Sequence, residues 1–291
     1  MKQYSLIELE TYQAVVEAGS FNLAADRLST SAATVSRRIS TLESALGVRL
    51  LNRTTRNINL TEAGEQYRDD VKNILESVEI SEERIGEGKA EAKGELRIAA
   101  PLSFGIKHLS PALPSFMKSH PNIIINLKLE DSQTDLQAEG IDIALRVTQN
   151  IKDSSLIATP LCSIPIVICA SPDYINKHGK PKSINDIQKY NFLGYSLASN
   201  NLKTRLGSNS DPRIGFVANN GDVIREAAIN GFGITALPLF LIEDDLKNGK
   251  LVTIIDNQVK PETLYAVRLS RRFTPTKVKV MVDYLRDTFK D

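Results

Sequence analysis

Apolar positions at the start of the chain recur every three or four residues, which is the spacing of one helix face. The pattern predicts three short helices, over residues 5–18, 21–28 and 31–46. Gly19 and Gly47 follow the first and the third, at positions where glycine commonly ends a helix. Two strand-like pieces, VRLL and NINL, come next and flank the segment NRTTR. Short helices followed by a basic hairpin predict a winged helix-turn-helix, a DNA-binding architecture.

A longer amphipathic segment runs from Thr61, which can cap it, to about residue 88. Its apolar residues are spaced four, three, four and seven apart, which is the alternation of a coiled-coil seam. They are Tyr67, Val71, Ile74, Val78 and Ile85. One amphipathic helix packed on its own domain would show the same pattern. We favour dimerisation, because a long charged helix with a narrow apolar stripe has little else to bury against.

The pattern changes after the segment GEGKAEAKGE, whose composition is that of a hinge. Strand-like runs such as ELRIAA, IIINLKLE and IDIALRV alternate with predicted helices over 103–118 and 133–139. A similar set begins at IPIVICASP and includes a predicted helix over 222–230, and a last helix over 275–289 closes the chain. This alternation predicts parallel sheet with crossover helices. Two α/β lobes joined by crossing strands form a cleft that suits a small ligand.

These patterns predict an α/β fold overall, in three parts. The parts are a winged helix-turn-helix domain over 1–61, a linker and dimerisation helix over 62–90 and an effector-binding domain over 91–291. Within the last part, lobe I is expected over 94–161 with 269–291, and lobe II over 162–268.

The composition argues against several classes of protein. The 291 residues are 42% hydrophobic and 24% charged, as in a soluble globular protein. No apolar run is long enough to span a membrane, and the first residues lack the apolar core of a secretion signal, so we expect no membrane partner. The cysteines, Cys162 and Cys169, give no disulfide framework, which fits a cytoplasmic location. With three histidines, a His-rich metal site is not expected.

The net charge of +1 hides a strongly basic stretch. Six arginines and one acid, Glu43, lie between Arg27 and Arg56, and no lysine occurs between Lys2 and Lys72. The third predicted helix has one narrow apolar stripe, and its opposite face holds short polar residues. A helix that enters the major groove needs such short side chains and a few long donors. A merely solvated face would interleave Glu and Lys, so we favour DNA contact.

Arg37 is our first candidate for reading a base, because arginine pairs bidentately with guanine or clamps a phosphate. Ala33 and Thr34 can meet a thymine methyl group. The other candidates are expected to hold phosphates, or to enter the minor groove in the case of the wing. They are Ser31, Ser36, Arg38, Arg53, Thr54 and Arg56.

The stretch FNLAADRLSTSAATVSRRISTLESALGVRLLNRTTRNINLTEAGEQY resembles the winged helix-turn-helix of LysR-type transcriptional regulators. The elements S-F-x-x-A-A-x-x-L, V-S-R-x-I-x-x-L-E-x-x-L-G-x-x-L-L-x-R-T-T-R and L-T-E-A-G cover residues 20–67 without a gap. The wing LLNRTTRNINLTEAG is closest to a large subgroup of the family. GIDIALRV, ASPDYI and NGFGITALP stand in the order of the family's effector domain, so the resemblance covers essentially the whole chain.

The resemblance implies a helix-turn-helix at about 21–40 and an effector domain that resembles periplasmic binding proteins. It implies a homodimer built on the linker helix, often paired into a homotetramer, and an interrupted palindromic operator on double-stranded DNA. RNA polymerase is a candidate partner. No cofactor is expected beyond a small-molecule effector whose identity the sequence does not give.

The turn AAPLSFG is the first candidate for effector binding. Ser103 is placed to cap the following helix, so its hydroxyl and nearby amides can hold a carboxylate, although a plain N-cap explains it equally well. The resemblance favours a ligand, since this turn lines the family's effector cleft, and we expect an anionic one. Arg146 can pair with that anion, or with Asp131 or Asp135. The full set, with the turns NNGD and GFG, is Pro101, Ser103, Phe104, Arg146, Asn220, Gly221, Phe232 and Gly233.

Two other functions compete with a ligand-responsive regulator. The first is a solute-binding protein with an accessory N-terminal domain, against which the basic winged helix and the missing signal peptide both count. The second is an enzyme on the two-lobed scaffold. The sequence shows no nucleophile–base pair, metal cluster or phosphate loop, so no catalytic residue is expected. We interpret the cysteines as ordinary buried residues rather than a redox pair, because side chains seven apart in an extended run point to opposite faces.

Overall fold

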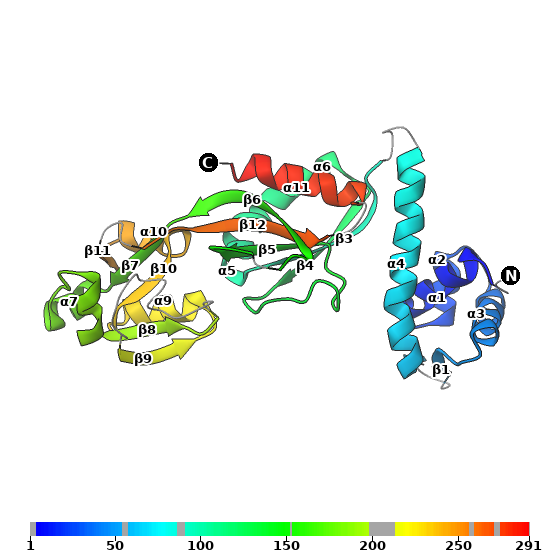
Figure 1. Ribbon diagram of the computed structural model, residues 1–291, viewed down its shortest axis with the longest axis horizontal. Coiled ribbons are helices and arrows are strands. Elements are labelled where there is room, and N and C mark those ends of the chain that lie inside the picture. Colours follow the sequence, from blue (N-terminus) through cyan, green and yellow to red (C-terminus); the bar gives the residue numbers. More distant parts are fainter. Residues whose placement is uncertain are drawn as a thin grey trace. The chain divides into compact units, whose positions relative to one another are not determined.

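The computed structural model describes residues 4–53, 58–85, 91–151, 153–197, 213–255, 259–270 and 274–290. The chain forms two compact units (Figure 1). The N-terminal unit is Met1–Glu91 with Phe273–Thr276, and the C-terminal unit is Ala92–Arg272 with Lys277–Asp291. No helix among the described residues has the length and apolar character needed to cross a membrane.

The N-terminal unit begins with the three helices that the sequence predicts. Gly19 and Gly47 follow the first and the third with φ angles of 60° and 72°, the left-handed conformation that glycine adopts without strain. The hydroxyl of Ser31 caps the third helix by accepting a hydrogen bond of 3.2 Å from the Thr34 amide. The helices are α1 (Leu6–Ala18), α2 (Phe21–Arg27) and α3 (Ala32–Leu46).

A hairpin and a long helix complete this unit. Strands β1 (Leu51–Arg53) and β2 (Ile58–Leu60) pair antiparallel, and helix α4 (Glu62–Ile85) follows directly. Thr61 caps α4, as predicted, by accepting a hydrogen bond of 3.0 Å from the Gly64 amide. A Cβ atom on Gly64 would lie 2.1 Å from the Leu50 carbonyl oxygen, so the first turn of α4 approaches the chain before β1 as closely as only glycine allows.

The larger sheet of the C-terminal unit has the strand order β4-β3-β5-β12-β6. Strand β3 runs parallel to β4 and β5, as the sequence predicts, while β12 is antiparallel to both β5 and β6. The bounds are β3 (Gly94–Ala100), β4 (Ile123–Leu129), β5 (Ile143–Thr148), β6 (Leu156–Ile164) and β12 (Glu262–Leu269).

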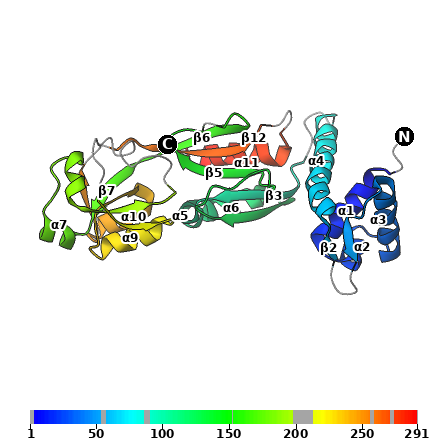
Figure 2. The ribbon, with the colours of Figure 1, turned by 60° about the horizontal axis from the view of Figure 1, so that its bottom comes forward.

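Helical segments cover one face of this sheet (Figures 1 and 2). One continuous stretch consists of α5 (Leu102–Phe104), the π-helix η1 (Gly105–Leu109) and α6 (Ser110–Ser119). Helix α11 (Thr276–Thr288) lies beside α6, because the Tyr284 hydroxyl donates a hydrogen bond of 2.7 Å to the Ala112 carbonyl.

The helix predicted over 133–139 is wrong, since this segment forms turns. The Asp135 carboxylate accepts hydrogen bonds from the amides of Gln137 and Ala138, at 2.9 and 3.1 Å. An aspartate that binds the amides after it offers the backbone an alternative to a helix, which explains the difference.

The second lobe is built around β7 (Ile166–Ala170), which lies between β10 (Thr235–Pro238) and β11 (Val252–Ile255). Both neighbours are antiparallel to β7, so the predicted parallel sheet is wrong here, while β8 (Asn191–Tyr195) and β9 (Arg213–Ala218) do pair in parallel. The helices of this lobe are α7 (Pro172–His178), the 3-10 helix η2 (Ile184–Lys189), α9 (Gly221–Ile229) and α10 (Leu239–Lys247).

The strands that link the lobes are longer than expected. Strands β6 and β12 pair from Leu156 with Leu269 to Ile164 with Glu262, all within the larger sheet. The expected lobe boundaries at residues 162 and 268 therefore fall inside these two strands. The β-rich run from 156 to 170 changes sheet at Pro165, which has no amide hydrogen to continue the ladder.

Candidate DNA-binding surface and ligand site

Helix α3 presents two faces of opposite character. Val35, Ile39 and Leu42 are completely buried in the core of the N-terminal unit, as the apolar stripe predicts. Ala33 and Arg37 are exposed on the other face. The hydroxyls of Ser31 and Thr34 lie 2.9 Å apart at the start of the helix, beside these exposed positions. A long donor among short side chains on an exposed helix is the surface that major-groove readout requires.

The two adjacent arginines of α3 have different environments. Arg38 is half-buried, and its guanidinium donates a hydrogen bond of 3.4 Å to the Thr11 hydroxyl on α1. Thr11 donates in turn to the Ile7 carbonyl at 2.6 Å. Arg38 therefore joins α3 to α1, whereas Arg37 is exposed. The phosphate contacts expected of Arg38 and the half-buried Ser36 stay predictions.

Glu43 has a structural role that the sequence did not indicate. Its carboxylate accepts hydrogen bonds from the amides of Leu50 and Leu51, at 2.8 and 3.1 Å, and so fixes the start of the wing to α3. The one feature of the sequence that could have pointed to this role is that Glu43 is the single acid in a basic stretch. Arg53 ends β1, while Thr54 and Arg56 lie outside the described residues, as does the side chain of Arg53.

The residues of the predicted dimer stripe on α4 differ in burial. Val71 is only 1% exposed and belongs to the core of the N-terminal unit, and the Tyr67 ring lies 5.9 Å from that of Tyr12. For Val71 the dimer assignment is thus wrong, because the residue packs on its own domain. Ile74, by contrast, is 41% exposed, and the side chain of Ile85 lies outside the described residues.

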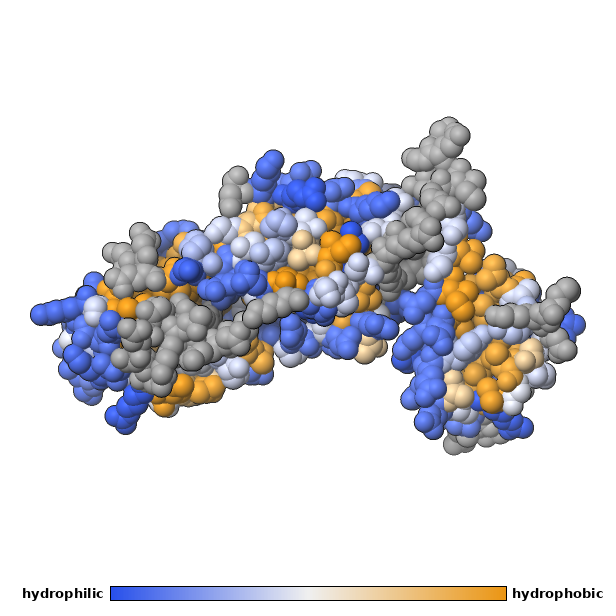
Figure 3. Space-filling view, viewed as in Figure 1, coloured by the Kyte–Doolittle hydropathy of each residue, from blue (hydrophilic) through white to orange (hydrophobic). Residues whose placement is uncertain are grey.

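A surface hollow of about 700 Å³ lies along α4 and is also lined by Tyr4, which precedes α1. Figure 3 shows hydrophobic residues exposed beside this helix on the face in view. The hollow combines apolar, hydroxyl and acidic groups, and its lining residues are Tyr4, Tyr67, Asp70, Asn73, Ile74, Ser77, Val78, Ser81 and Glu82.

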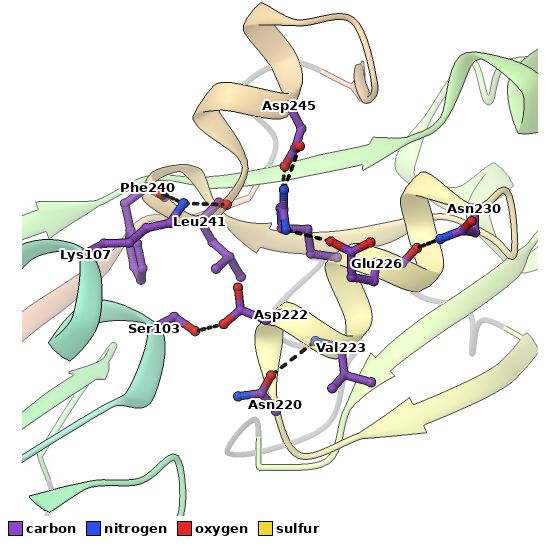
Figure 4. A network of polar contacts seen from close by, with 11 residues as sticks. Ser103, Lys107, Asn220, Asp222, Val223, Glu226, Asn230, Phe240, Leu241 and Asp245 are labelled. Atoms are coloured by element: carbon purple, nitrogen blue, oxygen red, sulfur yellow. Dashed lines mark hydrogen bonds and ion pairs between the residues drawn. The ribbon is translucent and has the colours of Figure 1, made fainter.

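Ser103 does not cap the helix at the AAPLSFG turn, contrary to expectation. It lies inside α5, is buried, and its hydroxyl donates a hydrogen bond of 2.5 Å to the carboxylate of Asp222 on α9 (Figure 4). The helix follows Pro101, and its first amide, that of Leu102, donates to Asp131 at 3.0 Å. Both acceptors at this turn are therefore carboxylates of the protein itself.

The NNGD turn faces the same place from the second lobe. The Asn220 side chain caps α9 by accepting a hydrogen bond of 3.1 Å from the Val223 amide. Its amide nitrogen donates to Asp131 at 2.7 Å. Gly221 approaches Leu241 so closely that a Cβ atom would lie 2.8 Å from that side chain. The structure thus brings the turns of Ser103 and Asn220 together through Asp131 and Asp222, neither of which was a candidate for effector binding.

Other expected ligand residues lie apart from this network. Phe104 is 3% exposed and packs edge-on against the rings of Phe240 and Phe289, at centroid distances of 5.5 and 5.3 Å. Phe232 is 60% exposed, and a Cβ atom on Gly233 would lie 2.3 Å from the Asn191 carbonyl oxygen. Phe104 is a core residue, and Gly233 serves close backbone packing against β8.

Arg146, on strand β5, binds the backbone of its own lobe. Its guanidinium donates a hydrogen bond of 2.9 Å to the Thr134 carbonyl, and burial lowers its pKa while Asp153 and Asp135 oppose that shift. Among the described residues, Arg146 forms no salt bridge with Asp131 or Asp135, and Asp135 acts on it only through its charge. Its pairing with an anionic ligand stays a prediction.

Lys107 and His108 lie where α5–η1 meets α10. The Lys107 ammonium donates to the carbonyls of Phe240 and Leu241, at 3.4 and 3.2 Å (Figure 4). The His108 ring lies against Phe104 and Phe240, and its Nε2 is buried without a hydrogen-bond partner among the described residues. Burial lowers the pKa of His108, the Lys107 charge lowers it further, and Glu243 opposes both. In the described part of the chain, no group of three or more His, Cys, Asp or Glu side chains could hold a metal ion.

Comparisons with known proteins agree with this arrangement. Residues 6–65 match the family described as "Bacterial regulatory helix-turn-helix protein, lysR family", and residues 89–290 match "LysR substrate binding domain". The chain is 30% identical to the HTH-type transcriptional regulator DmlR of Escherichia coli K12, over 98% of this chain and 95% of that protein. It is 33% identical to the regulator CrgA of Neisseria meningitidis serogroup C, over 96% and 95%. A solved structure of CrgA from Neisseria meningitidis aligns with a TM-score of 0.60 at 30% identity, over 98% of this chain and 99% of that one.

Proposed function

Because the chain belongs to the LysR family of DNA-binding transcriptional regulators, we propose that Arg37 reads its operator and that a small molecule bound in the C-terminal unit controls this reading. The observation that carries the proposal is the exposed face of α3, where Arg37 stands among short side chains opposite a buried stripe. Ala33 and Thr34 are the positions beside it for contact with a thymine methyl group. Ser31, Ser36 and the wing residues hold phosphates.

The operator has two half-sites, because one helix reads few bases and a two-fold dimer doubles the contacts. We assign the dimer contact to the hollow on α4, with Ile74 and Val78 as its apolar part. Ile74→Lys should then weaken self-association in analytical ultracentrifugation. Leu23→Lys, at an exposed leucine of α2 outside the hollow, is the matched control. Equal sedimentation of both variants and the unaltered chain would contradict this assignment.

The effector site lies where the AAPLSFG and NNGD turns meet. Two donors that converge there from different lobes, the Leu102 amide and the Asn220 side chain, support a ligand with a carboxylate. The relatives are named transcriptional regulators, and we propose that the two-lobed unit binds its ligand without converting it.

Genome-wide footprints of the bound protein, followed by titration of the recovered sites, test the function. We expect an interrupted palindrome in the footprints and an affinity that falls steeply with salt, since the arginines replace counterions on the phosphates. Footprints without a shared sequence, or an affinity independent of salt, would count against the proposal.

A further inference from the structure

The carboxylate of Asp131 binds groups from both lobes of the C-terminal unit. One of its oxygens accepts the Leu102 amide at 3.0 Å, and the other accepts the Asn220 side-chain amide at 2.7 Å. Leu102 and Asp131 follow strands β3 and β4 of the first lobe, while Asn220 follows β9 of the second. Two donors from separate lobes therefore converge on the two oxygens of one side chain.

A second connection runs in the opposite direction. Ser103 of the first lobe donates to the carboxylate of Asp222 in the second, at 2.5 Å (Figure 4). The Leu102 amide, the Asn220 side-chain amide and the Ser103 hydroxyl are thus directed at aspartates of the chain itself. A ligand carboxylate that used the Leu102 and Asn220 donors would have to take the place of Asp131.

Hydrogen bonds, rather than salt bridges, form the connection at this point. Among the described residues, neither Asp131 nor Asp222 forms a salt bridge, and Asp222 interacts with Arg225 only through its charge. Lys107 is directed at backbone carbonyls of α10, and Arg225 pairs with Asp245 and Glu226. A bound ligand carboxylate offers the same two acceptor oxygens as Asp131 and can replace its hydrogen bonds.

We propose that the Asp131 carboxylate is an internal ligand, which holds the lobes together in the effector-free chain and which an effector carboxylate displaces. The inference rests on the proposed function, because it assigns the regulation of that same site. Displacement breaks the connection from Asp131 to Asn220 and leaves the Ser103–Asp222 bond as the remaining side-chain contact between these two turns. Ligand binding then changes the spacing of the lobes, which is the movement that a regulator transmits.

Distance measurements within single chains test this inference without DNA. Spin labels at Lys118 on α6 and Lys177 on α7 report the lobe separation, in a full-length chain whose own cysteines are replaced by alanine and which is diluted with unlabelled chain. Asp131→Ala should give a longer and broader distance distribution than the unaltered chain. Asp244→Ala, at an exposed aspartate of α10, should leave the distribution unchanged. An unchanged distribution in Asp131→Ala overturns the inference.

Formate provides the second arm, because it has the size of the carboxylate that Asp131→Ala removes. Formate should return the distribution of Asp131→Ala to that of the unaltered chain, and chloride at the same ionic strength should not. If the distance distribution of Asp131→Ala stays broad in formate, the proposed carboxylate receptor is overturned.

If the alanine variant does not fold, Asp131→Asn replaces it, since asparagine keeps the size of the side chain and removes its charge. Asp131→Asn should lengthen the distances to a smaller degree. A distance distribution equal to that of the unaltered chain would overturn the inference.

Operator binding by the same chains separates this inference from the proposed function. If the unaltered chain shows no sequence-specific DNA binding, the proposed function fails whatever the distances are. If it binds its operator and Asp131→Ala keeps the original lobe distance, only the internal ligand is excluded.

Discussion

The hydroxyl of Tyr12 donates a buried hydrogen bond of 2.7 Å to the carbonyl of Gly64, which lies 52 positions further along the chain. The bond joins helix α1 to the first turn of α4, so it links the helical bundle that includes α3 to the helix that we assign to dimerisation. Burial raises the pKa of Tyr12 to about 12, so the phenol keeps its proton, and the bond, at neutral pH.

Removing this hydroxyl should destabilise the N-terminal unit. Tyr12→Phe leaves the Gly64 carbonyl buried without a partner, and we expect the free energy of unfolding to fall by about 1–3 kcal/mol. Urea unfolding followed by circular dichroism measures the change, with Tyr190→Phe, at a tyrosine of the other unit, as the control. A loss no larger than that of the control would show that the bond contributes little.

Gly64→Ala should have a larger effect than Tyr12→Phe. The added methyl group would lie 2.1 Å from the backbone oxygen of Leu50, which cannot move without displacing the wing. We expect a loss of about 3 kcal/mol in the same unfolding experiment. Gly19→Asn is the matched control, because its Cβ would meet nothing within 4 Å and asparagine tolerates the left-handed conformation. Equal stability of the two variants would contradict the close approach.

The two cysteines should differ in reactivity. Burial raises the pKa of Cys169 to about 12, whereas Cys162 is only half-buried. Because the thiolate is the reactive form, Cys169 should resist iodoacetamide at pH 8 in the folded chain and react after unfolding. Mass spectrometry of the labelled peptides checks this. Modification of Cys169 in the folded chain at the rate seen in urea would contradict its burial.

Acid should destabilise the C-terminal unit through His108. Its folded pKa is lowered from the ordinary 6.5, so in the window below 6.5 the unfolded chain binds a proton that the folded chain does not. The free energy of unfolding therefore falls as the pH falls from 6.5 towards the lowered value. His108→Phe keeps the aromatic contacts and should flatten this dependence, while His178→Phe, at an exposed histidine, should not. The measurement is the free energy of unfolding of both variants across this pH range. An equal pH dependence in His108→Phe and His178→Phe would contradict the assignment to His108.

Local patterns predicted the N-terminal unit well. Helix periodicity depends on neighbours three and four positions apart, so the buried stripe of Val35, Ile39 and Leu42 could be read directly. The helix ends at Gly19 and Gly47 follow from the conformational freedom of glycine.

Relationships between distant residues could not be predicted in this way. Whether Val71 packs on its own domain or on a second chain depends on where α1 lies, which the spacing along α4 does not contain. Asp131 and Asn220 are 89 positions apart, and Ser103 and Asp222 are 119 apart, so no local pattern joins them. The family resemblance pointed to the AAPLSFG turn, but the contacts that Asp131 and Asp222 make with this turn became visible only in three dimensions.

Arg38→Ala should act on stability, since Arg38 joins α3 to α1 through Thr11. We expect a lower melting temperature than for Arg37→Ala, whose exposed side chain leaves the core unchanged. Thermal unfolding of both variants is the measurement. If Arg37→Ala melted lower than Arg38→Ala, the different environments of the two arginines would have no consequence for folding.

The most direct test of DNA reading by α3 is a titration of the recovered operator, and of each of its single base-pair variants, with the unaltered chain and Arg37→Ala. Arg37→Ala should lose about 1–3 kcal/mol of binding free energy, roughly 5- to 150-fold in affinity, and should stop discriminating at one base pair in each half-site. Arg286→Ala, which removes the same charge from an exposed position on α11, should bind as the unaltered chain does. Unchanged affinity of Arg37→Ala for every operator variant would contradict the assignment of α3 as the recognition helix with Arg37 at its centre.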